Sequence, residues 1–253
     1  MHKLLPGLLL VLSTTAASAA PAADSDLRRR GHLVVSADRL MPLFSYDREQ
    51  VTTHFPNATT TDTVDQSSFS LLWGGGSTLT SPVRPFTSPR IGVDYTISDG
   101  FTVGGSLAWT TTLGGTTSSQ EQAGPTTSTT SYGTPSFSVF GLAPRVGYVF
   151  GLGDRFSFWP RGGLSYFWGG TSAPNANNTR RHEVSYSLWA LDLEPLFAFT
   201  PVPHVAVVGG PVLDVPLSGG IKDTIVAGSS SATTSRDYSS LHFGLTLGLA
   251  VYL

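Results

Sequence analysis

The sequence contains no cysteine and almost no lysine. The absence of cysteine excludes disulfides, thiolate metal sites and a lipidated cysteine. The only lysines are Lys3 and Lys222, although soluble β-proteins normally carry lysine on their surfaces and edge strands. Charged residues of all kinds make up 13% of the chain, about half of the share that globular proteins usually have. Glycine, serine and threonine stand in their place, which is unusual for a protein surrounded by water.

A large net charge and long hydrophobic runs are missing as well. The formal net charge of −2 gives no reason to expect a nucleic-acid partner. After the N-terminal segment, no stretch of about 18 apolar residues occurs, so a membrane-spanning helix is not expected. The six histidines are scattered without paired spacing, and we therefore expect no metal site and no cofactor.

The N-terminus has the features of a secretory signal peptide. Lys3 precedes an apolar core at residues 4–12, and a small-residue Ala-Ser-Ala motif follows. This pattern predicts that residues 1–19 are removed on export. Residues 20–31 are expected to form a flexible leader before a single folded domain, residues 32–253.

Nearly all of that domain alternates large apolar residues with small or polar ones, and this period of two predicts β-strands. The pattern is clearest at the C-terminus, where every second residue from Leu241 to Leu253 is apolar. Eight such segments can be drawn, most with about 9–11 alternating residues, the length that a tilted strand needs to cross a bilayer. The first segment, residues 33–44, is irregular at Arg39 and Pro42, which predicts a bulge.

The connections between these segments alternate between short and long. The short ones are residues 98–100, 151–155 and 200–203, and the long ones are approximately residues 47–86, 110–136, 169–186 and 217–240. Short turns at one end and long polar loops at the other are typical of outer-membrane barrels. We therefore expect an all-β fold, an eight-stranded antiparallel up-and-down transmembrane β-barrel.

The second face of the segments decides which side is inside. It is small, rich in glycine and sparsely charged, and this suits the narrow interior of eight strands, which side chains just fill. Its charged residues predict an interior ion-pair network: Arg90, Asp94, Arg145, Arg161, Asp192, Glu194 and Asp214. Simple closure of the 151–155 turn predicts that Arg145 lies opposite Arg161, with Asp192 and Glu194 close enough to neutralise both.

Aromatic residues gather near the two ends of the expected strands, as in the aromatic girdles of membrane proteins. Near the long loops lie Trp109, Trp168 and Trp189. Near the short turns lie Tyr148, Phe150, Phe156, Phe158, Phe197 and Phe199.

These features together resemble the eight-stranded outer-membrane barrels of Gram-negative bacteria, of the OmpA membrane-domain and OmpX type. The resemblance covers residues 32–253 and rests on the signal peptide, strand count, loop asymmetry, girdles, interior charges and last strand. It implies a monomer in the outer membrane that contacts lipids and the barrel-assembly machinery. In that family the machinery reads the last strand, which usually ends in Phe; here the corresponding residues are Leu249, Val251 and Leu253.

Four functions remain open from the sequence. The first is a non-enzymatic barrel with a plugged interior, whose long loops serve envelope integrity or bind a surface ligand. The second is a narrow channel gated by the interior charges, and the third is a soluble barrel with its apolar face turned inward around a ligand. The fourth is a lipid-modifying enzyme using Ser240, His242 and Asp237, although the sequence lacks a Gly-x-Ser-x-Gly motif and His242 is also consistent with a rim residue hydrogen-bonded to its neighbours.

Overall fold

The computed structural model describes residues 27–55, 58–69, 85–123, 126–174 and 180–253. The expected signal peptide lies outside these segments. Most of the described residues form antiparallel strands, and one 3₁₀ turn, η2 (Pro85–Thr87), lies among them. The strands are β1 (Leu33–Phe55), β2 (Ala58–Phe69), β3 (Arg90–Ser98), β4 (Phe101–Thr112), β5 (Thr116–Ala123), β6 (Thr126–Gly133), β7 (Ser136–Tyr148), β8 (Phe150–Gly151), β9 (Phe156–Pro174), β10 (Arg180–Val202), β11 (Val205–Ala227) and β12 (Ser230–Tyr252).

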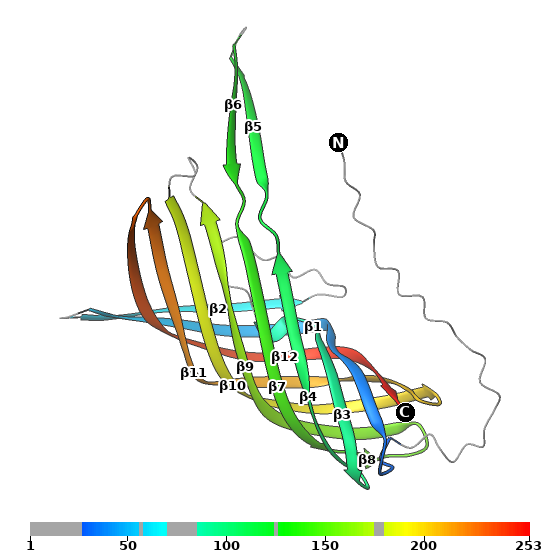
Figure 1. Cartoon of the computed structure of the whole chain (residues 1–253). Coiled ribbons are helices and arrows are strands. Elements are labelled where there is room, and N and C mark those ends of the chain that lie inside the picture. Colours follow the sequence, from blue (N-terminus) through cyan, green and yellow to red (C-terminus); the bar gives the residue numbers. More distant parts are fainter. Residues whose placement is uncertain (1–26, 56–57, 70–84, 124–125, 175–179) are drawn as a thin grey trace.

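Within the described segments, eight strands form a closed ring in the order β1, β3, β4, β7, β9, β10, β11 and β12 (Figure 1). Each strand pairs antiparallel with its two neighbours in the ring. The ring closes where β1 pairs with β12, beginning at Val34 opposite Tyr252. The expected eight-stranded up-and-down barrel is thus confirmed. Among the described residues, no helix is both long enough and apolar enough to cross a membrane.

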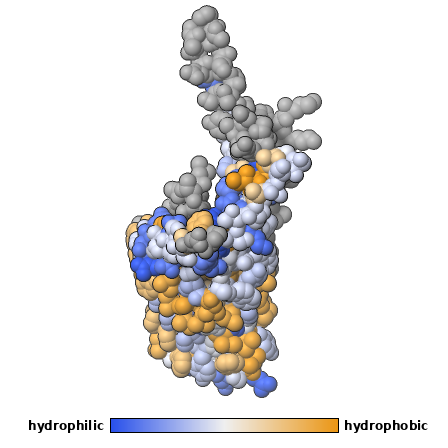
Figure 2. Space-filling model, turned by 90° about the vertical axis from the view of Figure 1, so that its left-hand side faces the viewer, coloured by the Kyte–Doolittle hydropathy of each residue, from blue (hydrophilic) through white to orange (hydrophobic). Residues whose placement is uncertain are grey.

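The alternation of side chains places the apolar face on the outside of the ring. In β12, Phe243, Leu245, Leu249 and Val251 are exposed and Leu247 is partly exposed, whereas the residues that alternate with them, from Gly244 to Tyr252, are buried. Figure 2 shows the result as a hydrophobic band around the visible face of the barrel, below a more hydrophilic zone. An exterior of this kind is what a hydrocarbon environment stabilises.

The two groups of aromatic residues lie on this exterior. At the short-turn end, the Phe156 ring stacks on Phe199 at 4.8 Å between centroids, and Phe158 lies 5.2 Å from Phe197. Tyr148 and Phe150 make a further pair there at 4.7 Å.

The opposite end of the band carries the three tryptophans of the expected girdle, Trp109, Trp168 and Trp189. The Trp189 ring lies 4.5 Å from Tyr166, and Trp109 is 70% exposed. Trp168, the third tryptophan, follows Phe158 on β9 by ten residues. At about 3.3 Å per residue and a tilt of about 40°, this spacing corresponds to about 25 Å along the barrel axis. That height matches the apolar band of outer-membrane barrels.

The expected long loops are strands over much of their length. Barrel strand β9 continues to residue 174, β10 begins at residue 180, β11 continues to residue 227 and β12 begins at residue 230, while β1 continues past residue 44 to pair with β2. Residues 116–123 and 126–133 pair with each other as a separate β5–β6 hairpin. Threonine favours the β conformation, but a ribbon that is exposed on both faces lacks the alternation of apolar and polar residues from which a strand is predicted. The sequence pattern therefore did not reveal these strands.

Part of the expected flexible leader is fixed against the short-turn end of the barrel. The Gly100 amide donates to the Arg28 carbonyl at 2.8 Å, and the Gly31 amide donates to the Thr96 carbonyl at 2.8 Å. The Leu27 side chain is buried beneath the ring. Residues 27–31 therefore belong to the folded domain.

The β5–β6 hairpin forms a sheet of its own, and its base is closed by a backbone hydrogen bond of 2.9 Å from Thr134 to Gly115. We expect that excising residues 116–133 and joining these two positions through Asn-Gly leaves the barrel folded. The melting temperature should change by no more than about 2 °C, because β5 and β6 pair with each other and no strand pairing of the barrel is removed. Heat-modifiable migration on a gel measures this outcome; its loss in the shortened chain would contradict the independence of the hairpin.

Candidate functional site

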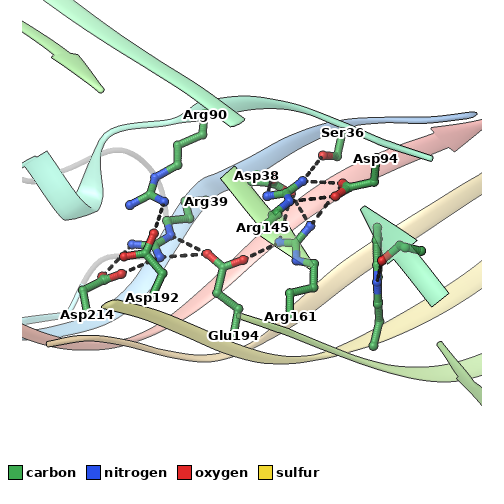
Figure 3. A network of polar contacts seen from close by, with 12 residues as sticks. Ser36, Asp38, Arg39, Arg90, Asp94, Arg145, Arg161, Asp192, Glu194 and Asp214 are labelled. Carbon is green, nitrogen blue, oxygen red and sulfur yellow. Dashed lines mark hydrogen bonds and ion pairs between the residues drawn. The ribbon is translucent and has the colours of Figure 1, made fainter. Parts of the chain in front are cut away.

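Nine charged side chains form a buried layer inside the barrel (Figure 3). All seven residues that the sequence placed there belong to it: Arg90, Asp94, Arg145, Arg161, Asp192, Glu194 and Asp214. Two further members, Asp38 and Arg39, come from β1. We call these nine residues the charged layer.

Arg39 connects β1 to two distant strands. Its guanidinium donates to both carboxylate oxygens of Asp214, at 2.7 and 2.8 Å, and to Glu194 Oε1 at 2.8 Å. A further hydrogen bond of 2.9 Å runs from Arg39 Nη1 to the Phe86 carbonyl. Bidentate pairing of this kind fixes direction as well as charge, so Arg39 holds β10, β11 and η2 in one arrangement.

Arg145 and Arg161 share the carboxylate of Asp38. Arg145 contacts Asp38 Oδ2 at 2.5 Å and binds Asp94 through two hydrogen bonds of 2.9 and 2.5 Å. Arg161 contacts Asp38 Oδ1 at 3.3 Å and Glu194 Oε2 at 2.7 Å. The two guanidinium groups are therefore separated by carboxylates, which removes the like-charge repulsion expected from their proximity.

The expected pairing within this layer is partly wrong. Arg145 lies opposite Gly163, and Arg161 lies opposite Gly147, so the two arginines are diagonal neighbours. The connection between β7 and β9 includes the short strand β8, and this sets the register. Glu194 does neutralise Arg161, directly across the strand pair.

Asp192 has a different partner from the one expected. Its Oδ2 accepts a hydrogen bond of 2.9 Å from Arg90 Nη1, and its Oδ1 accepts one of 2.8 Å from Ser165. Asp192 therefore neutralises Arg90 on the far side of the ring. The carboxylate between Arg145 and Arg161, which we expected to be that of Asp192, is that of Asp38.

The two residues that sequence reasoning missed lie in the predicted bulge. The register of β1 shifts between Ala37 and Met41 and again between Pro42 and Phe44. Arg39 has a φ of 52°, in the left-handed region that residues other than glycine rarely adopt. This turn directs both Asp38 and Arg39 inward although they are adjacent in the chain. The available signal was the break in alternation at Arg39.

Glycines in the wall leave room for these long side chains. A Cβ at Gly92 would collide with the Arg145 guanidinium, and one at Gly141 would lie 2.5 Å from the Phe167 ring. A larger residue at either position would therefore displace a member of the packed interior.

An apolar plug closes the interior on the short-turn side of the charged layer. We call this cluster the lower plug: Leu27, Val34, Val149, Trp159, Ala198, Ala206, Val208, Ala250 and Tyr252. Trp159 Nε1 donates to Thr102 at 3.1 Å, and the Arg161 guanidinium lies 4.8 Å from the Trp159 ring. This cation–π contact joins the plug to the charged layer.

A second apolar cluster, the upper plug, closes the interior on the hairpin side: Phe86, Ala108, Val139, Phe167, Tyr186, Leu188, Ala190, Ile221 and Tyr238. Phe86 enters from η2 and meets the Phe167 ring at 5.4 Å in an edge-on arrangement. The Arg90 guanidinium lies 5.2 Å from the Phe167 ring. The charged layer is thus enclosed between two plugs.

The residues considered for a catalytic role do not form a triad. His242 Nδ1 is paired with Asp47 at 2.7 Å, and its ring stacks on Phe86 at 5.7 Å. Asp237 instead lies 3.1 Å from exposed His54. Ser240 and His242 are both buried rather than on the rim.

The last strand is bound to the first through its final residues. The Leu253 amide donates to the Leu33 carbonyl at 2.9 Å, and the Leu33 amide donates to the Leu253 carbonyl at 3.1 Å. Leu249, Val251 and Leu253 point outward and are exposed. The described residues contain no cluster of three potential metal ligands.

Beyond the barrel, the hairpins carry their own ion pairs. Arg48 and Asp65 are cross-strand neighbours on β1 and β2, and Arg48 Nε donates to Asp65 Oδ1 at 2.7 Å. The carboxylate of Asp223 lies 2.5 Å from His182 Nε2 and 2.8 Å from Arg236 Nη2.

The protruding strands also surround a cavity of about 470 Å³. We call it the vestibule; hydroxyl groups such as those of Thr112, Thr171 and Ser185 line it, together with the carboxylate of Glu183. Its volume lies within the range of small-molecule binding sites, about 300–1,000 Å³.

Several solved structures are similar to this chain. A major outer-membrane protein of Thermus thermophilus is 14% identical, with 83% of this chain and 99% of that chain covered and a TM-score of 0.47. OprG of Pseudomonas aeruginosa is 11% identical (88% and 97% covered, TM-score 0.44), and Ail, the attachment invasion locus protein of Yersinia pestis, is 11% identical (89% and 100% covered, TM-score 0.36). No protein-family model and no curated protein matches the chain.

We expect Arg161→Leu to destabilise the barrel by about 3–5 kcal/mol, because it leaves Glu194 and Asp38 each without one buried guanidinium partner. Thermal melting in detergent measures the loss. The matched control is Arg155→Leu at an exposed turn residue, which should change stability by no more than about 0.5 kcal/mol. Equal melting temperatures for the two variants would contradict a stabilising role for the layer.

On the outer hairpin, hydrogen bonds from Arg48 and then Tyr46 hold the pKa of Asp65 below its ordinary value of 3.8. Because the folded pKa is lowered, this contact stabilises the hairpin above the ordinary value and is lost as the pH falls through the folded pKa. We expect Arg48→Gln to raise the pKa of Asp65, as followed by the ¹³C shift of its carboxyl group. An unchanged titration in Arg48→Gln, as in an Arg181→Gln control, would show that the contact does not form in solution.

Proposed function

We propose that the chain is an integral outer-membrane β-barrel protein, exported through a cleaved signal peptide and without enzymatic activity. Its interior is closed to solutes, and its long hairpins serve envelope integrity or surface interaction. Outer-membrane lipids and the barrel-assembly machinery are its expected partners, and the barrel is expected to be a monomer of the type that the OmpA membrane domain and OmpX represent.

The exterior supports the membrane location. The apolar band is bounded by aromatic residues at both ends, and its height of about 25 Å corresponds to the hydrophobic band of known outer-membrane barrels. A soluble barrel of the lipocalin type would bury this face, but here the buried face carries the charged layer. Detergent should therefore be required to extract the protein from membranes.

The observation that carries the proposal is the closed interior. The charged layer surrounds a cavity of only about 10 Å³, and an apolar plug lies on each side of it. An ion crossing the barrel would need to pass both plugs without water. The free energy of removing its hydration shell far exceeds the electrostatic stabilisation that the charged layer can provide. This favours a structural role for the layer over that of a channel gate.

The shape of the hairpin end supports a surface role. Strands β1, β2 and β9 to β12 and the β5–β6 hairpin extend beyond the apolar band. The vestibule at this end is lined by residues of β4, β7, β9, β10 and β11. Their exposed surfaces are rich in serine and threonine hydroxyls. Such a surface is hydrated and offers many hydrogen-bonding groups to a ligand outside the cell.

The test is to measure single-channel conductance in planar bilayers, with protein purified in detergent. We expect no stable conductance, because the lower and upper plugs enclose the charged layer on both sides. Stable conductance that changes in Arg145→Leu or Arg161→Leu would overturn this view and establish the channel.

Protease treatment of intact cells tests the orientation separately. We expect the protease to cleave the β5–β6 hairpin in intact cells, without prior lysis. Protection of this hairpin until lysis would contradict an outward position.

A further inference from the structure

Four polar atoms of the charged layer and its wall make no hydrogen bond within the described part of the protein. They are Arg90 Nε, Arg90 Nη2, Arg161 Nε and Ser106 Oγ. All three residues are at least nine-tenths buried, and all three line the same cavity of about 10 Å³. A buried polar atom without a partner normally costs about 1–3 kcal/mol, so this convergence points to a ligand.

The remaining atoms of the two arginines are already engaged. Arg90 Nη1 binds Asp192, and Arg161 directs Nη1 and Nη2 toward Asp38 and Glu194. The unpaired Nε–H groups point along other directions of the guanidinium planes, and the rigid fork of arginine prevents one carboxylate from satisfying every donor. The cavity wall also contains Asp192 and Glu194 themselves.

Volume and charge together select the ligand. A cavity of about 10 Å³ admits about one water molecule. The layer already contains five carboxylates against four guanidinium groups (the carboxylates are Asp38, Asp94, Asp192, Glu194 and Asp214). An anion would add to this excess of negative charge, and a cation would meet N–H donors, whereas a neutral molecule that both accepts and donates hydrogen bonds fits each side.

We propose that this cavity is a binding site for one structural water molecule. The water accepts hydrogen bonds from Arg90 and Arg161 and donates to the Ser106 hydroxyl oxygen and to a carboxylate of the wall. It thereby connects the Arg90–Asp192 pair with the Arg161–Glu194 pair. The charged layer then forms one continuous hydrogen-bonded unit across the barrel.

The first test is a high-resolution crystal structure of the full chain in detergent, with bromide in the crystallisation solution and data at the bromine absorption edge. We expect one density peak within hydrogen-bond distance of Arg90 and Arg161 and no anomalous signal at that peak. A bromide peak would overturn the proposal in favour of an anion site. Absence of any peak would overturn it as well.

A matched pair of variants provides the second test. Ser106→Val puts additional methyl volume toward the cavity, whereas Ser106→Ala removes the hydroxyl and leaves the space. We expect the peak to persist in Ser106→Ala and to be absent from Ser106→Val, with the melting temperature of Ser106→Val lower by several degrees. Equal or higher stability of Ser106→Val relative to Ser106→Ala would show that the two arginines need no water.

Discussion

The fold depends on carboxylates and guanidinium groups that are enclosed away from water. A barrel with an apolar exterior can keep polar groups only inside, where each charge must find its partner within the protein. Glu194 illustrates how tightly this condition is met, because its two oxygens serve Arg39 and Arg161 on opposite sides of the ring. Such pairs add little net stability over apolar residues, but their geometry admits one register.

The two plugs give this layer its physical setting. Aromatic rings lie directly against two of the four guanidinium groups, with Trp159 under Arg161 and Phe167 beside Arg90. Each of these two arginines is therefore desolvated on one face by a ring that also attracts its charge. The interior among the described residues is a packed core with a polar middle, as expected for eight strands, whose side chains just fill the space inside.

The sequence predicted the parts of this arrangement that repeat with a period of two. Arg90, Asp94 and Arg145 were assigned to the interior because each occupies a position of one face in a regular strand. The contribution of β1 could not be derived in this way, since a bulge reverses the face between Asp38 and Arg39. Phe86 reaches the interior from a 3₁₀ turn, for which no periodic pattern exists. The ion-pair partner of a residue such as Asp192 depends on the register between strands, and that register is set only when the ring of strands closes.

The position of Arg39 on the first strand has a consequence for how the chain matures. Its carboxylate partners, Glu194 and Asp214, lie 155 and 175 residues later in the chain. In a nascent barrel that lacked β10 and β11, the Arg39 guanidinium would lie at the level of the acyl chains without these two carboxylate partners, at high energetic cost. Partly inserted forms are therefore disfavoured, and entry into the bilayer is coupled to arrival of the last strands in a single cooperative event.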